Sequence, residues 1–507
     1  MSAIPTHIDF RANTQHVAPG MPASVRKATA RFLGTRAAVV DVVGEVRWQT
    51  LRQAGHDIRL HTINHLDYYL TLLEERVTQA GGFVHWARDP AEARRIVLEI
   101  AQQHQVKRAV KAKSMATEEI GLNHALIEAG IQTLETDLGE FIVQLAGTGP
   151  SHIIVPAVHL TKEDIADLFH EKLGVDASPD PLKLAALARA KLRAEFLAAD
   201  MGITGANFLV AETGTLVMVT NEGNGRMSTT LPPLHVAVAG IDKIVPDMES
   251  LNVLLKLLPR SATGQKMSAY TTFITGPRRT DEEQGAREFH LVLLDNGRTR
   301  MLQDPVTRET LLCIRCGACL NVCPVYNNVG GHAYGFAYSG PIGAILSPQL
   351  LGTRVAAALP FASSLCGACA DICPVKIPIV EILLRLRRRV VEGDAAEAAT
   401  APPAARIGSQ AMARAMSIPA LYRIGAQALQ IAQAPFRREN WLPNLPPPIN
   451  RWTMTRPLPA IAPDFRAAWR NRTLEGRRRE RGIRIGMAAA VFGIVGLVGW
   501  LLSRRRR

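Results

Sequence analysis

The seven cysteines of this 507-residue chain all lie in one short stretch. They form two runs, Cys313-x2-Cys316-x2-Cys319-x3-Cys323-Pro324 and Cys366-x2-Cys369-x3-Cys373-Pro374. Cysteines at this spacing, closed by a proline, are typical ligands of iron–sulfur clusters, whose chemistry is electron transfer. In such a run, three thiolates hold one cluster and the fourth reaches across to a second cluster. The residues therefore predict two clusters that share their two cysteine runs.

The crossing rule assigns a ligand set to each cluster. Cluster one receives Cys313, Cys316, Cys319 and Cys373. Cluster two receives Cys323, Cys366 and Cys369, and the position that should supply its fourth ligand is Ser363. The spacing leaves open whether cluster two is 3Fe–4S, or 4Fe–4S with Ser363 or water as the fourth ligand.

Structural zinc is the main alternative for these cysteines, because it also favours thiolate pairs two residues apart. Zinc ribbons close with four ligands in two pairs, and a run of four cysteines followed by proline fits that pattern poorly. A disulfide framework is disfavoured because a chain of this length can bury a sufficient core without disulfide cross-links, and because we recognise no signal peptide at its start.

The layout around the cysteines resembles the helical ferredoxin module in the iron–sulfur subunits of succinate dehydrogenase and fumarate reductase. The connection between the two runs is long, and Ile379–Val390 has helical spacing with basic residues near its end. In that family the second group also lacks one cysteine and holds a 3Fe–4S centre, which the resemblance implies as one option here.

The rest of the chain must position these residues, and its composition predicts five parts. They are a helical or irregular segment (1–60), an α/β domain (61–300), a helical ferredoxin-type domain (301–390), an Ala- and Pro-rich helical extension and linker (391–476), and a basic apolar tail (477–507).

Alternating helical and strand-like patterns predict that residues 61–300 form an α/β domain with a largely parallel sheet. We expect helices at Glu92–Gln105 and Glu118–Gly130. The predicted buried strands are Val106–Ala112, Ile131–Glu135, His152–Pro156, Phe208–Ala211, Thr215–Thr220 and His235–Gly240.

Two polar loops of this domain are candidate ligand sites. The first contains Glu212 and Thr213, and the second contains Asn224 and Arg226 between glycines that permit close approach of an anion. A hairpin turn with a solvated arginine is an equally good interpretation. Neither loop matches a nucleotide-binding motif, and we expect His61 and His65 to be surface or packing residues.

Three segments of the α/β part, Gly202–Val217, Thr220–Arg226 and Gly240–Val245, resemble the lactate-utilisation (LUD) domain. Followed by the two cysteine runs, they identify the chain as similar to the lactate-utilisation protein B family. The resemblance implies a cytoplasmic iron–sulfur subunit of a three-component system that oxidises L-lactate to pyruvate. It also implies an α/β fold related to CoA-transferases and sugar-phosphate isomerases. The implied partners are a cysteine-rich iron–sulfur protein and a second LUD-domain protein.

Most of the net charge of +14 belongs to the last part of the chain, since residues 466–507 hold twelve arginines and two glutamates. These arginines flank an uncharged stretch, residues 485–502, rather than a folded basic face, so no nucleic-acid partner is expected. Eighteen helical residues span about 27 Å, which just suffices for a bilayer core. We favour an anchor or interfacial helix on the cytoplasmic face of the membrane, near the quinone pool, over a helix packed on a partner.

Three functions follow from these patterns. The favoured one is an electron-transfer subunit in lactate oxidation, non-catalytic or only partly catalytic, because no flavin or nicotinamide motif is present. The second keeps the relay for another 2-hydroxy acid or a thiol/disulfide couple. The third is a non-redox ligand-binding module whose clusters are structural or sensory.

Overall fold

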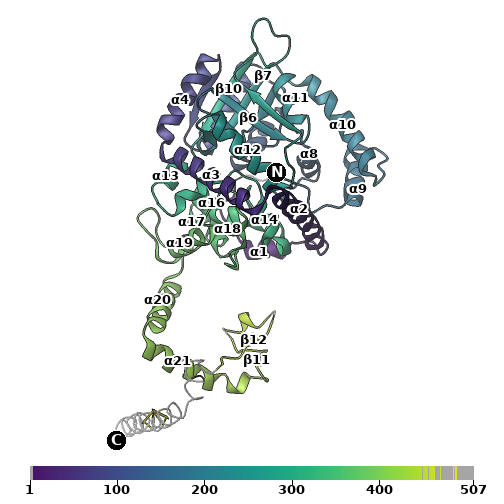
Figure 1. The fold of residues 1–507 in the computed structure, drawn as a ribbon. Coiled ribbons are helices and arrows are strands. Elements are labelled where there is room, and N and C mark those ends of the chain that lie inside the picture. Colours follow the sequence, from purple (N-terminus) through teal and green to yellow (C-terminus); the bar gives the residue numbers. More distant parts are fainter. Residues whose placement is uncertain are drawn as a thin grey trace. The chain divides into compact units, whose positions relative to one another are not determined.

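The computed structural model describes residues 4–447, 449–454 and 456–462, together with Trp469 and four residues between 483 and 487. The chain divides into two compact units, Met1–Ala401 and Pro402–Arg507, which are described separately. In the first unit, helices surround a central sheet and a further group of short helices carries the cysteines (Figure 1).

Four helices precede the first strand of the sheet. The two longest are separated by Gly44, whose φ of +84° is a conformation that glycine adopts without strain. The third helix, α3, buries several polar side chains, including Arg52 and Arg59. The bounds are α1 (Phe10–Thr14), α2 (Met21–Val43), α3 (Glu45–Asn64) and α4 (Leu66–Gln79).

Six strands form the main sheet in the order β1-β10-β7-β4-β2-β3, and every neighbouring pair is parallel. The central strands are buried on both faces, as is usual for a parallel sheet covered by helices. The prediction of an α/β domain with a parallel sheet is therefore confirmed. Its strands are β1 (Phe83–Ala87), β2 (Arg108–Lys111), β3 (Gln132–Glu135), β4 (Met201–Thr204), β7 (Leu234–Gly240) and β10 (Glu288–Leu294).

Alternate residues of β7 point to opposite faces of the sheet, so the two faces have separate cores. On one face, Val236 and Val238 pack with apolar residues of α5 and α7. On the other face, Ala237 and Ala239 pack with apolar residues of α4. The helices of this part are α5 (Pro90–Gln103), α6 (Met115–Glu119), α7 (Leu122–Glu128), α8 (Leu138–Leu145), α9 (Lys162–Leu173), α10 (Pro181–Ala198), α11 (Asn224–Thr230) and α12 (Met248–Ala262).

A second sheet of four strands has the order β8-β5-β6-β9. Two of the predicted strands pair here as an antiparallel hairpin instead of joining the parallel sheet. The strands are β5 (Phe208–Val210), β6 (Thr215–Thr220), β8 (Ile244–Val245) and β9 (Tyr270–Ile274).

The cysteines lie in a helical region that follows the α/β part, as expected. Its longest element, α19, covers the predicted helix after Cys373. The elements are α13 (Arg298–Leu302), η2 (Thr307–Leu312), α14 (Ala318–Val322), α15 (Tyr326–Val329), η3 (His332–Tyr334), α16 (Gly340–Leu351), α17 (Thr353–Ala356), η4 (Leu359–Phe361), α18 (Ala368–Ile372) and α19 (Ile379–Glu392).

Two predicted elements are wrong. The apolar run His152–Pro156 is a loop, not a strand, because its side chains bond to the cysteine region: His152 Nε2 lies 3.1 Å from Asn321 Oδ1. The helix predicted at Glu118–Gly130 is two helices, α6 and α7, because Gly121 takes a φ of +63° between them.

The second unit contains α20 (Pro403–Ser417), α21 (Pro419–Ala432) and a short antiparallel pair, β11 (Trp441–Leu442) with β12 (Leu458–Pro459). Among the residues described, no helix has the length and apolar character needed to cross a bilayer. Apart from Gly486 and Met487, the predicted anchor at residues 485–502 lies outside the described residues.

Candidate functional site

The cysteines lie in two loops that have the same backbone conformation. Each has a left-handed residue before its Cys-Gly pair, Arg315 with a φ of 59° and Leu365 with a φ of 57°. Each then has a left-handed glycine, Gly317 or Gly367, before a one-turn helix begins. Because left-handed backbone is costly for a residue with a side chain, its repetition at matching positions indicates a required loop shape.

Backbone N–H groups of these loops point at sulfur. Arg315 N donates to Cys313 Sγ at 3.4 Å, and Ile377 N donates to Cys373 Sγ at 3.5 Å. At Cys323, which is predicted to hold the second cluster, Tyr326 N donates to Sγ at 3.5 Å. Such N–H groups stabilise thiolate charge and are one of the levers that set a cluster's reduction potential.

Neighbouring thiols raise one another's pKa values, both within and between the two cysteine runs. Burial raises the pKa of Cys373 to about 11, and the nearby Cys313 thiolate acts in the same direction. Burial raises the pKa of Cys369 to about 12, and here the added influence comes from Cys323 and Cys366. The exchange of Cys373 and Cys323 between the two runs stays a prediction of the crossing rule. The influence of Cys313 on the pKa of Cys373, and of Cys366 on the pKa of Cys323, is consistent with it. Burial raises the pKa of Cys319, however, and Cys369 raises it further, as do Cys313, Cys316 and Cys373.

The spacing of the sulfur atoms argues against a single metal ion. No three of the seven described cysteine sulfurs lie within 4.8 Å of one another. Four thiolates on one zinc ion, each about 2.3 Å from the metal, would stand about 3.8 Å apart. The cysteine sulfurs therefore stand farther apart than the four ligands of one zinc ion do.

Ser363 occupies in the second loop the position that Cys313 holds in the first. Leu365 N donates to Ser363 Oγ at 3.1 Å, which matches the bond from Arg315 N to Cys313 Sγ. The serine oxygen is therefore presented by the same backbone shape as the cysteine sulfur. Arg387 fixes this loop from α19 by donating to Ser363 O at 2.9 Å.

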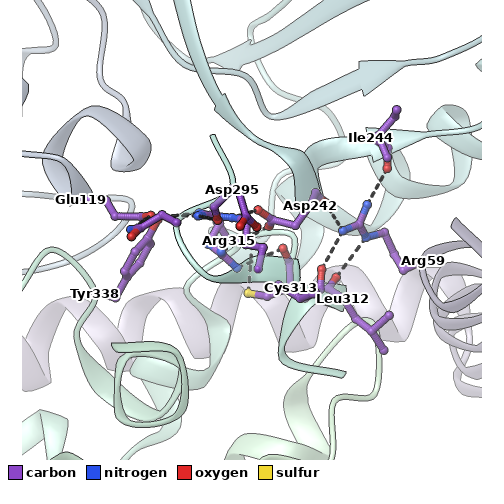
Figure 2. A network of polar contacts seen from close by, with 12 residues as sticks. Arg59, Glu119, Asp242, Ile244, Asp295, Leu312, Cys313, Arg315 and Tyr338 are labelled. Atoms are coloured by element: carbon purple, nitrogen blue, oxygen red, sulfur yellow. Dashed lines mark hydrogen bonds and ion pairs between the residues drawn. The ribbon is translucent and has the colours of Figure 1, made fainter. Parts of the chain in front are cut away.

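Helix α3 fixes the main chain beside two of the cysteines. Arg52 donates to Cys373 O at 2.7 Å, and His56 Nδ1 lies 3.0 Å from Val375 O. Two turns further along α3 from Arg52, Arg59 donates to the carbonyl of Ile244 at 2.7 Å (Figure 2). It also donates to the carbonyl of Leu311 at 2.7 Å. These residues were not predicted from the sequence, although their spacing of four and three residues was the available signal that they share one helix face.

A buried ion network joins the α/β part to the first cysteine loop (Figure 2). Arg298 donates to both oxygens of Glu119 at 2.9 Å and also to Asp242, while Arg315 lies 3.4 Å from Asp242. Tyr338 donates its hydroxyl to Glu119 at 2.7 Å. Burial alone would raise the pKa of Asp242, but the two guanidinium groups hold that pKa well below its usual range.

A cavity of about 550 Å³ lies at the carboxyl ends of β2, β4 and β7, the usual ligand-binding edge of a parallel sheet. Arg315 and Tyr338 of the cysteine region contribute to its lining, so the cavity adjoins the first cysteine loop. Two lysines that follow buried strands, Lys113 and Lys243, also line it. The sequence analysis missed both lysines, since a lysine after a strand is ordinarily solvated.

The structure separates the four predicted ligand-binding residues. Asn224 lines the cavity and is 4% exposed. Arg226 is exposed on α11 and does not line the cavity. Glu212 and Thr213 lie in the β5–β6 turn, also away from the cavity, and Glu212 is exposed.

The cavity contains charge of both signs. Burial, together with the guanidinium groups of Arg315 and Arg59, lowers the pKa of Lys243 to about 7. Burial and the Asp137 carboxylate raise the pKa of Glu222. Near neutral pH Lys243 is therefore only partly protonated, and an anion bound beside it would favour its charged form. The Glu222 carboxyl retains its proton more readily than usual.

Comparison with known proteins gives two family matches and several close relatives. Residues 70–294 match the LUD domain and residues 309–377 match the 4Fe-4S dicluster domain. Proteins called lactate utilization protein B from Bacillus thuringiensis (strain Al Hakam) and Bacillus cereus (strain AH187) are each 44% identical over 449 residues, covering 89% of this chain and 93% of theirs. A solved DUF162 family protein from Deinococcus radiodurans is 15% identical, with a TM-score of 0.27 over 45% of this chain and 98% of its own.

Proposed function

This chain belongs to the lactate utilization protein B family, and we propose that it is the electron-transfer subunit of a multi-protein system that oxidises L-lactate to pyruvate. As a member of that family it is an iron–sulfur protein of lactate utilization. The oxidation of the secondary alcohol to the ketone releases two electrons and two protons.

The main support for the proposal is the difference in solvent exposure between the thiols predicted to hold cluster one and those predicted to hold cluster two. Cys313, Cys316 and Cys373 are buried, and Arg315, which lies between the first two in the chain's first cysteine loop, lines the cavity. In the second group Cys323 and Cys369 are buried, whereas Cys366 is exposed. A relay needs one end near the electron donor and another that a partner protein can approach. The buried end and the exposed end of this region supply those two requirements.

The ligand sets complete the proposal. Cys313, Cys316, Cys319 and Cys373 hold a 4Fe–4S cluster, and Cys323, Cys366 and Cys369 hold the second cluster with Ser363 at the fourth position. Iron–sulfur clusters bound in this way carry single electrons. The chain's own residues supply the thiolates, the N–H donors to sulfur and the arginines that fix both loops. The second cluster is 3Fe–4S, or 4Fe–4S completed by Ser363 or water.

The partners in the proposal are a cysteine-rich iron–sulfur protein and a second LUD-domain protein. The first of these approaches the exposed Cys366 side, because that side is where a protein can come near a thiol of this chain. The cytoplasmic location and the relation in fold to CoA-transferases and sugar-phosphate isomerases rest on the family resemblance and belong to the proposal.

The test is a redox titration of the anaerobically purified chain together with both partner proteins. L-lactate should change the oxidation state of the clusters, followed by electron paramagnetic resonance, and pyruvate should appear in proportion. Glycolate and a thiol/disulfide couple, assayed in parallel, should be poorer donors. Clusters that keep their oxidation state with lactate and both partners present would favour a structural or sensory role instead.

A further inference from the structure

The cavity beside the first cysteine loop has polar atoms that the protein leaves without partners. Lys113 Nζ is buried and has no hydrogen-bond partner among the described residues. Asn224 Oδ1, an acceptor, and Arg315 Nε, a donor, are buried and equally unpartnered. Since a buried polar group without a partner costs about 1–3 kcal/mol, and a charged one more, three such atoms around one cavity indicate a ligand.

The carboxyl groups nearest to Lys113 do not pair with its ammonium group in place of a ligand. Burial raises the pKa of the Glu140 and Glu222 carboxyls, and the ammonium group of Lys113 opposes that rise, so it lies within electrostatic range of both. Neither carboxyl forms a hydrogen bond or ion pair with it, and the described contacts of Lys243 likewise include no such partner. Lys113, and Lys243 in its protonated form, are thus available to one bound anion.

The remaining lining defines the rest of the ligand. Asn224 Oδ1 needs a hydrogen-bond donor, which a hydroxyl group supplies. Apolar side chains from three elements, Ile142, Met218 and Leu258, form other parts of the wall. A molecule with a carboxylate, a hydroxyl and a short aliphatic part satisfies all three kinds of surface.

We propose that this cavity is the binding site for a 2-hydroxycarboxylate, with Lys113 and Lys243 holding the carboxylate and Asn224 accepting the hydroxyl hydrogen. This inference rests on the proposed function, because it assigns the electron donor of that system to a place in this chain. A cavity of about 550 Å³ exceeds the needs of lactate, so longer aliphatic 2-hydroxy acids should also enter.

The position of Arg315 explains why a ligand here matters to the cysteine region. Its side chain lines the cavity, while its backbone N–H donates to Cys313 Sγ and its guanidinium donates to Cys313 O at 3.3 Å. The bound acid would therefore lie one residue away from a cluster ligand, with no intervening element.

The experiment measures equilibrium binding of L-lactate to the full-length chain with its clusters in place, by anaerobic calorimetry. Lys113→Gln and Lys243→Gln should each weaken binding by about 10- to 100-fold, the range for a charge-assisted hydrogen bond. Lys256→Gln is the matched control, because Lys256 is exposed on α12, the helix that also supplies Leu258 to the cavity. Propionate, which lacks the hydroxyl, should bind more weakly than lactate, and L-2-hydroxybutyrate should bind.

Iron content and thermal unfolding of each variant separate a lost ligand contact from a lost fold. Because Lys113 Nζ has no protein partner, Lys113→Gln should leave both unchanged without ligand. Lactate affinity equal to wild type in both lysine variants, or equal affinity for propionate and lactate, would overturn the proposal. The proposal would also be overturned if inorganic phosphate displaced lactate at concentrations similar to that of lactate. That result would assign the cavity to a phosphorylated ligand.

The same variants distinguish this inference from the proposed function. If the Lys113→Gln, Lys243→Gln double variant still has its clusters reduced by lactate through the partner proteins, the cavity assignment fails and the relay function stands. If lactate fails to reduce the wild-type clusters with the partners present, the proposed function fails, whatever binds in the cavity.

Discussion

Ser363 is the residue at which the two cysteine loops differ in chemistry but not in shape. The backbone N–H that meets sulfur in the first loop meets the serine oxygen in the second. A neutral hydroxyl is a weaker ligand for iron than a thiolate, so the iron at this corner of the second cluster should be the first to leave. The asymmetry between the clusters thus comes from one side chain.

We predict that mild oxidation of the wild-type protein produces a 3Fe–4S signal in electron paramagnetic resonance, and that Ser363→Cys suppresses it. The added thiolate would complete a four-cysteine set in a loop already shaped to present it. Ser363→Ala is the control, since it removes the oxygen and should retain the signal. Identical spectra from all three proteins would refute the assignment of this position.

Arg59 serves a structural purpose that its charge alone does not explain. It is 1% exposed and donates to carbonyls of the β8 region and of the segment that leads into Cys313. Removing the guanidinium would leave several buried carbonyls without donors.

We predict that Arg59→Met lowers the free energy of unfolding by about 3–5 kcal/mol and reduces the bound iron per chain. Arg47→Met, on the exposed side of the same helix, should change stability by about 0.5 kcal/mol or less. Denaturant unfolding and iron analysis of the two variants make the comparison. Equal stability would show that the carbonyls find other partners.

At the scale of elements, the loop at residues 151–155 and the segment before η3 hold the two parts of the first unit together. Gly331 N donates to Ser151 Oγ at 3.1 Å, and a Cβ on Gly331 would overlap the carbonyl group of Ser151. The two backbones therefore approach more closely than any side chain at this position permits.

We predict that Gly331→Ala destabilises the protein by about 2 kcal/mol or more, because one of the two backbones must move. Gly149→Ala is the matched control in the neighbouring loop, where a Cβ would meet nothing within 4 Å. Thermal unfolding should show a lower midpoint for the first variant and an unchanged or slightly higher one for the second. Equal unfolding midpoints for the two variants would mean that the backbones at Gly331 and Ser151 can move apart at little cost in free energy.

Elements set by local pattern could be predicted from the sequence, and those set by distant contacts could not. The repeated cysteine spacing, the β7 run and the α19 helix all carry their own signal, so sequence reasoning found them. The apolar run at His152 looked like a strand because nothing local shows that His152 bonds to Asn321 and that the preceding Ser151 accepts a bond from Tyr326. The cavity lysines were missed for the same reason, since their burial depends on elements far away in the chain.

At the scale of the whole molecule, the first unit buries most of the thiols predicted to hold cluster one and exposes one thiol predicted to hold cluster two. The cavity and the first thiol group lie inside, and the second group reaches the surface at Cys366. On the proposed function, a protein partner would exchange electrons at the Cys366 side without access to the cavity, and a small acid would enter the cavity without displacing that partner.

The basic tail is the part of the chain for which we propose membrane attachment. Arginines flank the uncharged residues 485–502, and anionic lipid headgroups would attract them. Deleting residues 477–507 should abolish co-sedimentation with vesicles that contain anionic lipid, while the cluster spectra stay unchanged. A truncated protein that sediments like the full chain would exclude this role.

The arginines of α3 also bear on how the protein matures in the cell. Arg52 bonds to a residue 321 positions later in the chain, and Arg59 bonds to one 252 positions later. Helix α3 therefore leaves the ribosome long before the segments that it fixes have been made. Since non-local contacts form late in folding, the cysteine loops should reach their final shape only after nearly the whole first unit has been synthesised. Iron insertion would then act as a late checkpoint, selecting chains whose amino-terminal helices have already docked.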